Sequence, residues 1–399
     1  MNNVIMIGLV SFFADLSTEM VYPLIPLYLT TVFGATPALV GVIEGIAESL
    51  ASLLKVFSGY ATDKYRKKKP IAFFGYSTGL VYKMALIFAS SWVGILAARV
   101  IDRFGKGIRT APRDVLVSES SDATKLGHSF GLHKALDMAG SAAGILLAFF
   151  IMKAGNGAFA FKRIFLFSCV PTLMALFMFL FIKETGKPRE SRAPLNVFSG
   201  LRHLDSRLKL YLVVVFIFTL GNSSNTFLLL RAGNVGFDSA SVVLLYFLYN
   251  IVSSLLSIPL GRLSDRVGRK RVLIAGYVTF AIVYSGFAWA PGKATIIAAF
   301  ALYGVFTAMT AGVERAFIAE IAPAELRGTM LGLHSTIVGI ALLPASVMAG
   351  LLWNAFGPAL PFALGAGLSL AAALMLAFGL PKKAKKPASY SAFPGGDGK

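Results

Sequence analysis

The sequence predicts an all-α membrane protein, with twelve transmembrane helices in two duplicated halves of six helices each. The first observation is composition. Of the 399 residues, 56% are hydrophobic and only 14% are charged, whereas soluble domains carry about 25% charged residues. The second is length, because apolar stretches long enough to cross a bilayer as a helix recur along the whole chain.

The third observation is an internal repeat. The pattern Gly-x-x-x-Asp occurs at 59–63 and again at 261–265, a separation of 202 positions (261 − 59). The pattern Gly-x-x-x-Gly-x-His occurs at 127–133 and at 328–334, a separation of 201 (328 − 127). Two unrelated patterns with nearly the same offset indicate a duplication of half the chain.

Each predicted span must be a helix, because backbone polar groups in lipid have to be satisfied within their own segment. In chain order the spans are 4–32, 38–60, 70–90, 92–112, 128–152, 161–182, 209–231, 238–260, 271–290, 294–314, 329–353 and 358–380. The predicted domains are an N-terminal six-helix bundle (1–183), a cytoplasmic linker (184–208), a C-terminal six-helix bundle (209–381) and a disordered basic cytoplasmic tail (382–399).

Charge in the loops predicts the orientation. Lys and Arg are more frequent after even-numbered spans than on the opposite side by about five to one. The positive-inside rule therefore predicts a multi-pass protein of the plasma (inner) membrane with both termini cytoplasmic. These loops and the bilayer account for the net charge of +19, so nucleic acid is not expected as a partner. No basic region precedes the first span, so no cleaved signal peptide is expected.

The sequence offers no constellation typical of an enzyme. Cys169 is the single cysteine and falls in an apolar span. No metal-ligand cluster and no Ser/His/Asp set can be assembled, so neither catalysis nor a metal is expected. No Gly-x-x-x-x-Gly-Lys-Ser/Thr loop occurs, so no cofactor and no coupling to ATP is expected within this chain.

The Gly-x-x-x-Asp-Arg-x-Gly-Arg-Lys loop at 261–270, together with twelve spans in two duplicated halves, resembles the major facilitator superfamily and its loop signature, motif A. The copy at 59–69 departs from the signature, with Lys64 in place of Arg and Arg66 in place of the second Gly. The resemblance implies two six-helix bundles around a cavity that opens alternately to each side of the membrane.

The resemblance also implies a cytoplasmic gate. Asp63 and Asp265 would oppose the positive N-terminal end of a helix in the other half, near Gly127 and Gly328, and latch the cytoplasmic side. The alternative is that these loops act only as positive anchors. The residues assigned to the gate motif are Gly59, Asp63, Gly261, Asp265, Arg266, Gly268 and Arg269.

Ionisable and polar groups inside the spans are costly and usually face a cavity. The residues assigned to proton coupling or to the substrate cavity are Asp15, Glu19, Glu44, Glu48, Arg99, Asp102, Arg103, Asp137, Tyr22, Asn222 and Asn225. Arg99 matches the arginine of the family's antiporter signature in span 4, but Asp102 and Arg103 replace its Gln-Gly pair.

Two interpretations of these charges compete. In one, the span 4 residues Arg99, Asp102 and Arg103 pair with Glu44, Glu48 and Asp137 in a neutral network that fixes helix register. In the other, at least one acid is unpaired and carries a proton. The network is favoured for Glu48, Asp102 and Arg103.

Proton or substrate duty is favoured for Asp15 and Glu19, because span 1 contains no basic residue. Carboxylates one turn apart resist being ionised together, so one of them is expected to bind a proton. Tyr22 and Tyr28 are expected to lie nearby on the solute path.

The predicted function is a proton-coupled secondary active transporter that exports small organic molecules by alternating access. One alternative is a proton-coupled importer of an anionic or zwitterionic metabolite, because Arg and Lys are in surplus along span 4. An alternative of another class is a non-transporting membrane receptor or scaffold. The expected partners are a small-molecule substrate, protons and the lipid bilayer, and the protein is expected to be a monomer.

Overall fold

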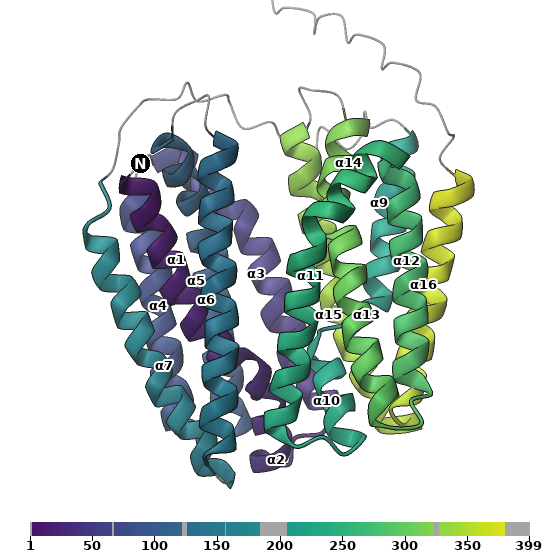
Figure 1. Cartoon of the computed structure of the whole chain (residues 1–399), viewed down its shortest axis with the longest axis horizontal. Coiled ribbons are helices and arrows are strands. Elements are labelled where there is room, and N and C mark those ends of the chain that lie inside the picture. Colours follow the sequence, from purple (N-terminus) through teal and green to yellow (C-terminus); the bar gives the residue numbers. More distant parts are fainter. Residues whose placement is uncertain are drawn as a thin grey trace, which may run out of the picture.

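The computed structural model describes residues 2–65, 68–121, 126–155, 157–183, 206–322 and 327–379, and every element in these ranges is helical. The helices of the first half, purple to dark teal, stand beside those of the second half, lighter teal to yellow (Figure 1). The predicted all-α fold in two bundles is therefore confirmed. The predicted linker and tail fall largely outside the described residues.

The first half contains α1 (Asn2–Val21), η1 (Tyr22–Leu24), α2 (Ile25–Phe33), α3 (Pro37–Tyr65), α4 (Lys68–Phe88), α5 (Trp92–Glu119), α6 (Leu126–Lys153) and α7 (Gly157–Leu180). The second half contains α9 (Ser206–Gly221), α10 (Thr226–Asn234), α11 (Ser239–Val267), α12 (Arg269–Ala288), α13 (Lys293–Thr310), α14 (Val313–Ile321), α15 (Arg327–Phe356) and α16 (Ala359–Gly379). The start of α1 and the end of α16 lie on one face of the molecule, called here the terminal face; α2 and α10 lie at the opposite end, called the far face (Figure 1).

Three spans are interrupted, so these helices form twelve spans in the described ranges. Pro23 and Pro26 interrupt the first span, since proline removes a backbone donor. Residues 222–225 separate α9 from α10, and residues 311–312 separate α13 from α14. Eleven spans have the length and hydropathy of a membrane-crossing helix, and α5 is left out because of its many charges.

The predicted loops of the gate motif are wrong, because the helices run further toward the terminal face than their apolar stretches. Apolar length marks the lipid-embedded part of a helix and not its end. Gly59 and Asp63 lie on α3, and Gly261 and Asp265 lie on α11. Only Gly268 stands between α11 and α12, with a φ of +99° that favours glycine.

The end of α5 was also predicted too early. The helix continues through Pro112 to Glu119, so Arg109 and Arg113 are helical residues of α5 and not loop residues. Arg109 lies over the ring of Tyr76 on α4, with its guanidinium carbon 4.6 Å from the ring centroid. The Arg109 side chain therefore packs inside the first bundle and does not extend into a loop.

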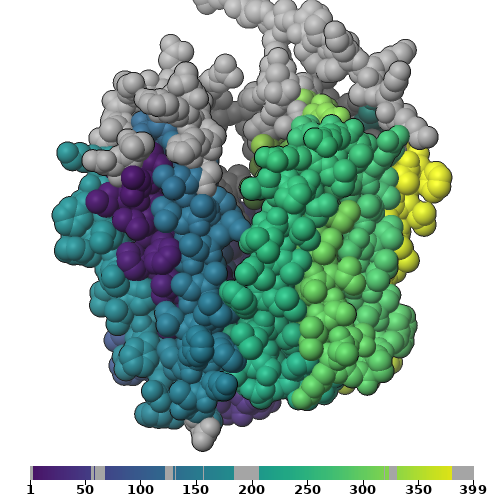
Figure 2. Space-filling model, in the orientation of Figure 1, coloured from purple at the N-terminus to yellow at the C-terminus, as the bar shows by residue number. Residues whose placement is uncertain are grey.

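The two halves meet through α3 and α15 at the far face, where glycines bring backbone against backbone. A Cβ added at Gly41 would collide with the carbonyl oxygen of Ser346, and one added at Gly350 would lie 2.6 Å from the carbonyl oxygen of Pro37. α2 also packs against α10 at this end. Toward the terminal face, Figure 2 shows a hollow between the blue atoms of the first half and the green atoms of the second. The molecule is thus closed at the far face and open toward the terminal face.

Candidate functional site

A buried ion-pair network lies between α3 and α5. Arg99 is 1% exposed and binds Glu44 with two hydrogen bonds, Nε to Oε1 at 2.9 Å and Nη2 to Oε2 at 2.5 Å. Arg103 Nη2 lies 2.7 Å from Glu48 Oε1, and Asp102 Oδ2 lies 3.5 Å from Arg99 Nη1. The predicted network therefore exists for these five residues.

Two further side chains complete the network. The ring of Tyr22 lies beneath both guanidinium groups, with its centroid 5.4 Å from Arg99 Cζ and 5.3 Å from Arg103 Cζ. Such cation–π contacts are stronger in a dry environment than in water. Lys83 on α4 is buried and lies within electrostatic range of Asp102. Its positive charge would balance the three carboxylates of the network.

Asp137 does not belong to this network, so its predicted pairing with Arg99 and Arg103 is wrong. Its carboxylate instead lies 2.7 Å from Lys134 Nζ on the same helix, α6. Asp15 on α1 lies within electrostatic range of the Asp137 carboxylate. The crossing of α1 with α6 therefore brings two acids together from helices distant in the sequence.

Glu19 is the acid that links the two halves. The hydroxyl of Tyr246, on α11, donates a hydrogen bond of 2.9 Å to Glu19 Oε2. The Tyr246 ring also contacts Tyr22, with ring centroids 5.7 Å apart. Lys106 and Arg103 lie within electrostatic range of the Glu19 carboxylate. Glu19 thus stands on the boundary between the bundles, held by a neutral partner from the other half.

The second half contributes a wall of tyrosines. The ring of Tyr249 stacks edge-on between Tyr246 and Tyr303, with centroid distances of 5.1 and 5.4 Å. Asn225 Oδ1 accepts a 2.6 Å hydrogen bond from the Tyr303 hydroxyl, and Asn225 Nδ2 lies 3.5 Å from that of Tyr249. Sequence analysis missed Tyr303, although a tyrosine in mid-span needs a partner for its hydroxyl.

The predicted position of Tyr28 on the solute path is wrong. Tyr28 is buried against Phe33, Phe161 and Phe165, with ring centroids 5.1 to 5.2 Å apart. Phe33 belongs to α2 and Phe161 and Phe165 to α7, so Tyr28 packs within the first bundle. Tyr22 alone of the two tyrosines reaches the boundary between the halves.

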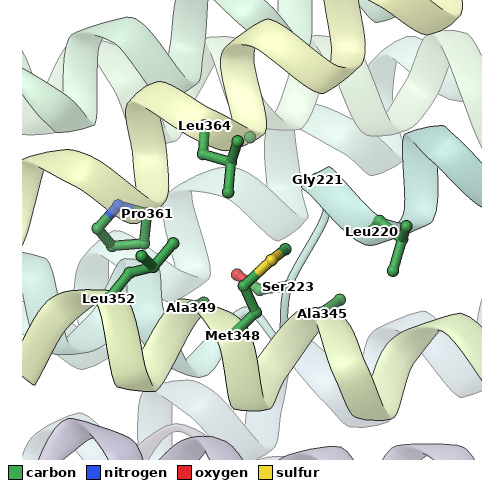
Figure 3. A pocket seen from close by; sticks show the side chains of 10 residues that line it. Leu220, Gly221, Ser223, Ala345, Met348, Ala349, Leu352, Pro361 and Leu364 are labelled. Carbon is green, nitrogen blue, oxygen red and sulfur yellow. The ribbon is translucent and has the colours of Figure 1, made fainter.

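The break that follows α9 places Asn222 and Asn225 outside regular helix. Asn222 is held by its backbone N–H, which donates to the carbonyl oxygen of Phe218 at 3.0 Å. A small cavity adjoins the break, with room for about one water molecule. Figure 3 shows Ser223 and Met348 pointing into it, beside Pro361 of α16. The break between α9 and α10 therefore borders a small cavity on the side that faces α15 and α16.

The gate motif connects three helices at the terminal face. Arg269 Nη2 binds Asp265 Oδ1 at 3.1 Å, and Arg269 Nη1 binds the carbonyl oxygen of Ala316 and Glu320 Oε2, both at 3.1 Å. Asp265 is 65% exposed. Arg266 is exposed, and a Cβ added at Gly261 would meet no atom of the described residues within 4 Å.

The first-half copy of the motif gives less information. Gly59 and Asp63 are helical, but their side-chain positions are outside the described residues, as are those at the helix starts near Gly127 and Gly328. The expected latch between the halves therefore stays a prediction.

Two helix bundles that meet at one face and part at the other, with charged and polar side chains between them, have the architecture of an alternating-access membrane transporter. The profile of the Major Facilitator Superfamily matches residues 7–231 and 210–395. The chain is 38% identical over 383 residues to an uncharacterized MFS-type transporter of Methanocaldococcus jannaschii, covering 94% of each protein. It therefore belongs to the major facilitator superfamily of transporters.

Two further proteins resemble the chain, one in part of its sequence and one in its fold. The class C tetracycline resistance protein of Escherichia coli is 32% identical over 148 residues, which is 37% of each chain. The crystal structure of the nucleoside transporter NupG superimposes with a TM-score of 0.79 at 12% identity, covering 94% of this chain and 98% of that one. The latter comparison concerns the fold alone.

Proposed function

We propose that the protein is a proton-coupled exporter of small organic molecules. The observation that carries the proposal is Glu19, an acid at the boundary of the two bundles whose hydrogen-bond partner, Tyr246, belongs to the other half. When the two halves separate around Glu19, its carboxylate loses the hydrogen bond from Tyr246. Its affinity for a proton then changes with the conformation, which is the physical requirement for coupling.

The surroundings of Glu19 favour a cationic or aromatic substrate. Arg99 and Arg103 are engaged by Glu44 and Glu48, so their positive charge is not available to an anion. The second half offers tyrosine rings, and Glu19 of the first half faces them with a carboxylate; this combination binds organic cations. The importer of an anionic metabolite is thereby the weaker candidate. The partial similarity to a tetracycline resistance protein supports the efflux direction.

Inside-out membrane vesicles containing the protein test the direction. With an acidic lumen, we expect them to accumulate ethidium, a fluorescent organic cation, and to lose it when a protonophore collapses the gradient. Vesicles from cells without the protein are the control. Accumulation only in right-side-out vesicles with an acidic exterior would favour the importer instead. A thermal-shift panel of metabolites and drugs, including tetracycline, would identify ligands without assuming a direction.

The latch is part of the proposal and predicts a loss of transport. Asp265→Asn removes the charge that would oppose a helix N-terminus in the alternate conformation. Because Asp265 is 65% exposed, we expect unchanged melting temperature but strongly reduced ethidium flux in proteoliposomes. Asp63→Asn should have a milder effect, since its motif is degenerate. Wild-type flux in Asp265→Asn would contradict the latch.

The proposal also includes the placement of the chain. The terminal face would lie in the cytoplasm of the plasma membrane, with the bundles divided at the linker 184–208 and the protein acting as a monomer. Labelling of introduced cysteines by a membrane-impermeant reagent, after Cys169→Ser, would test the orientation. Tail residues should react only in inside-out vesicles.

A further inference from the structure

A pair of side chains outside the proposed coupling site occurs once in each half. Tyr76 on α4 and His133 on α6 form the pair in the first half, and Tyr277 on α12 and His334 on α15 form it in the second. Both separations are 201 positions, 277 − 76 and 334 − 133. The duplication has therefore preserved a tyrosine and a histidine at equivalent places in both bundles.

The side chain that joins each pair differs between the halves. In the first half, Ser11 Oγ lies 3.4 Å from the Tyr76 hydroxyl and 2.8 Å from His133 Nε2. This neutral hydroxyl satisfies the histidine with a hydrogen bond. The first-half cluster is thus complete without any change of protonation.

In the second half, the joining group is a carboxylate. Glu314 Oε1 accepts a 3.3 Å hydrogen bond from the Tyr277 hydroxyl, and Glu314 Oε2 lies 3.8 Å from His334 Nε2. That separation exceeds a hydrogen bond. Among the described residues, His334 Nε2 is buried and has no hydrogen-bond partner. A carboxylate and an imidazole thus face each other across a gap that one bridging proton would close.

The groups around Glu314 come from four helices. They are Tyr277 of α12, His334 of α15, Tyr211 of α9 and the neighbouring Arg315 of α14. The Glu314 and His334 side chains retain 19% and 12% exposure, so water reaches them. α14 lies at the terminal face (Figure 1).

We propose that Glu314 and His334 form a second proton-binding site, separate from Asp15 and Glu19, which controls the docking of α14. A proton from water on the terminal face bridges Glu314 Oε2 and His334 Nε2 and draws α14 toward α15; its return to water releases them. The coupling of this site to transport rests on the proposed function, whereas its proton binding does not.

The structure supplies the connection from this site to the gate motif. α14 is joined to α13 by the turn at 311–312, so it can tilt as a unit. Arg269 binds the carbonyl oxygen of Ala316 on α14 and the carboxylate of Asp265 on α11. A displacement of α14 is therefore transmitted directly to the gate motif.

Solid-state or solution NMR of the full chain in nanodiscs, labelled with ¹⁵N-histidine, tests proton binding without any substrate. The chain has four histidines, and His334→Gln identifies the signal of His334. Because two coupled groups titrate together in macroscopic steps, we expect the His334 signal to change in two steps with pH and in a single step in Glu314→Gln. The matched control is Glu320→Gln, an acid on the same helix, which should keep both steps. Identical His334 curves in wild type and Glu314→Gln would overturn the site.

Transport gives the second measurement. Glu314→Gln should lose the pH dependence of ethidium flux while retaining exchange, and Glu314→Asp, which keeps the acid, should recover part of it. If Glu314→Gln is too unstable to purify, the Glu314→Asp titration decides, since it should keep two steps. If the wild type shows the two-step NMR titration but the pH dependence of transport is unchanged in Glu314→Gln, the proposed control of α14 docking is overturned. Absence of ethidium transport by the wild type would count against the proposed function and leave the NMR result standing.

Discussion

Replacing Arg99 by alanine is expected to lower the free energy of unfolding by about 3–5 kcal/mol, the cost of leaving a buried charge without its partner. Glu44 would lose both of its hydrogen bonds to Arg99, at 2.9 and 2.5 Å, in a site where neither side chain is more than 1% exposed. Thermal melting of the purified protein in detergent measures the effect. The matched control, Arg262→Ala, removes an exposed arginine of α11 and should not change the melting temperature.

A double variant separates charge from shape. Arg99→Met combined with Glu44→Gln removes both charges while keeping similar volumes, so it should regain much of the lost stability. If the double variant is as unstable as Arg99→Ala, the ion pair is not the source of the effect. Arg103→Ala distinguishes a structural role of Arg103 from a role in substrate binding: a structural role lowers the melting temperature, whereas a binding role leaves the melting temperature intact and abolishes stabilisation by ligand.

Neutralising Glu19 of span 1 is expected to abolish the accumulation of substrate that a pH gradient drives. Glu19→Gln can still accept the hydrogen bond from Tyr246 but cannot gain or lose a proton, so the two conformations interconvert without coupling. Exchange of substrate down its own gradient should survive. Paired measurements in proteoliposomes, with and without a pH gradient, separate the two activities, and Asp15→Asn is assayed in parallel.

Tyr246→Phe is the matched control for this experiment, because it removes the partner of Glu19 and keeps the acid. It should still concentrate substrate, with an altered pH dependence. If Glu19→Gln and Asp15→Asn both still concentrate substrate against its gradient, the coupling proton is bound elsewhere. Asp137, which lies beside Asp15, is then the next candidate; Glu44 is held by Arg99.

The sequence predicted the charge network well because buried charges must find partners. The spacing of Arg99, Asp102 and Arg103 places them on one face of a helix, and the acids of span 2 have the same periodicity. It could not predict the partner of Asp137. The choice between Arg99 and Lys134 depends on where α6 crosses α1, which periodicity does not specify.

The ends of the helices and the breaks within them were predicted less well, for a related reason. Hydropathy reports where a segment contacts lipid, so it missed the extension of α3 and α11 beyond the apolar region and the interruption at 222–225. The polar run of Asn222 and Asn225 was visible as a set of side chains. Hydropathy did not predict that the backbone would also unwind at these residues. The segment that follows, α10, packs against α2 and α3 at the far face, and such contacts between helices cannot be derived from hydropathy.

The glycine contacts at the far face have a consequence for the balance between conformations. The junction at Gly41 and Gly350 is made largely of backbone atoms, with the Phe227 ring and the Asn354 amide beside them, and none of these groups titrates. Its strength comes from dispersion and weak Cα–H···O contacts, each worth roughly 0.5–1 kcal/mol. Such a junction is indifferent to pH and to salt. A single added methyl group at Gly41 would act as a wedge and shift the resting population toward a form open at the far face, even in the absence of any substrate.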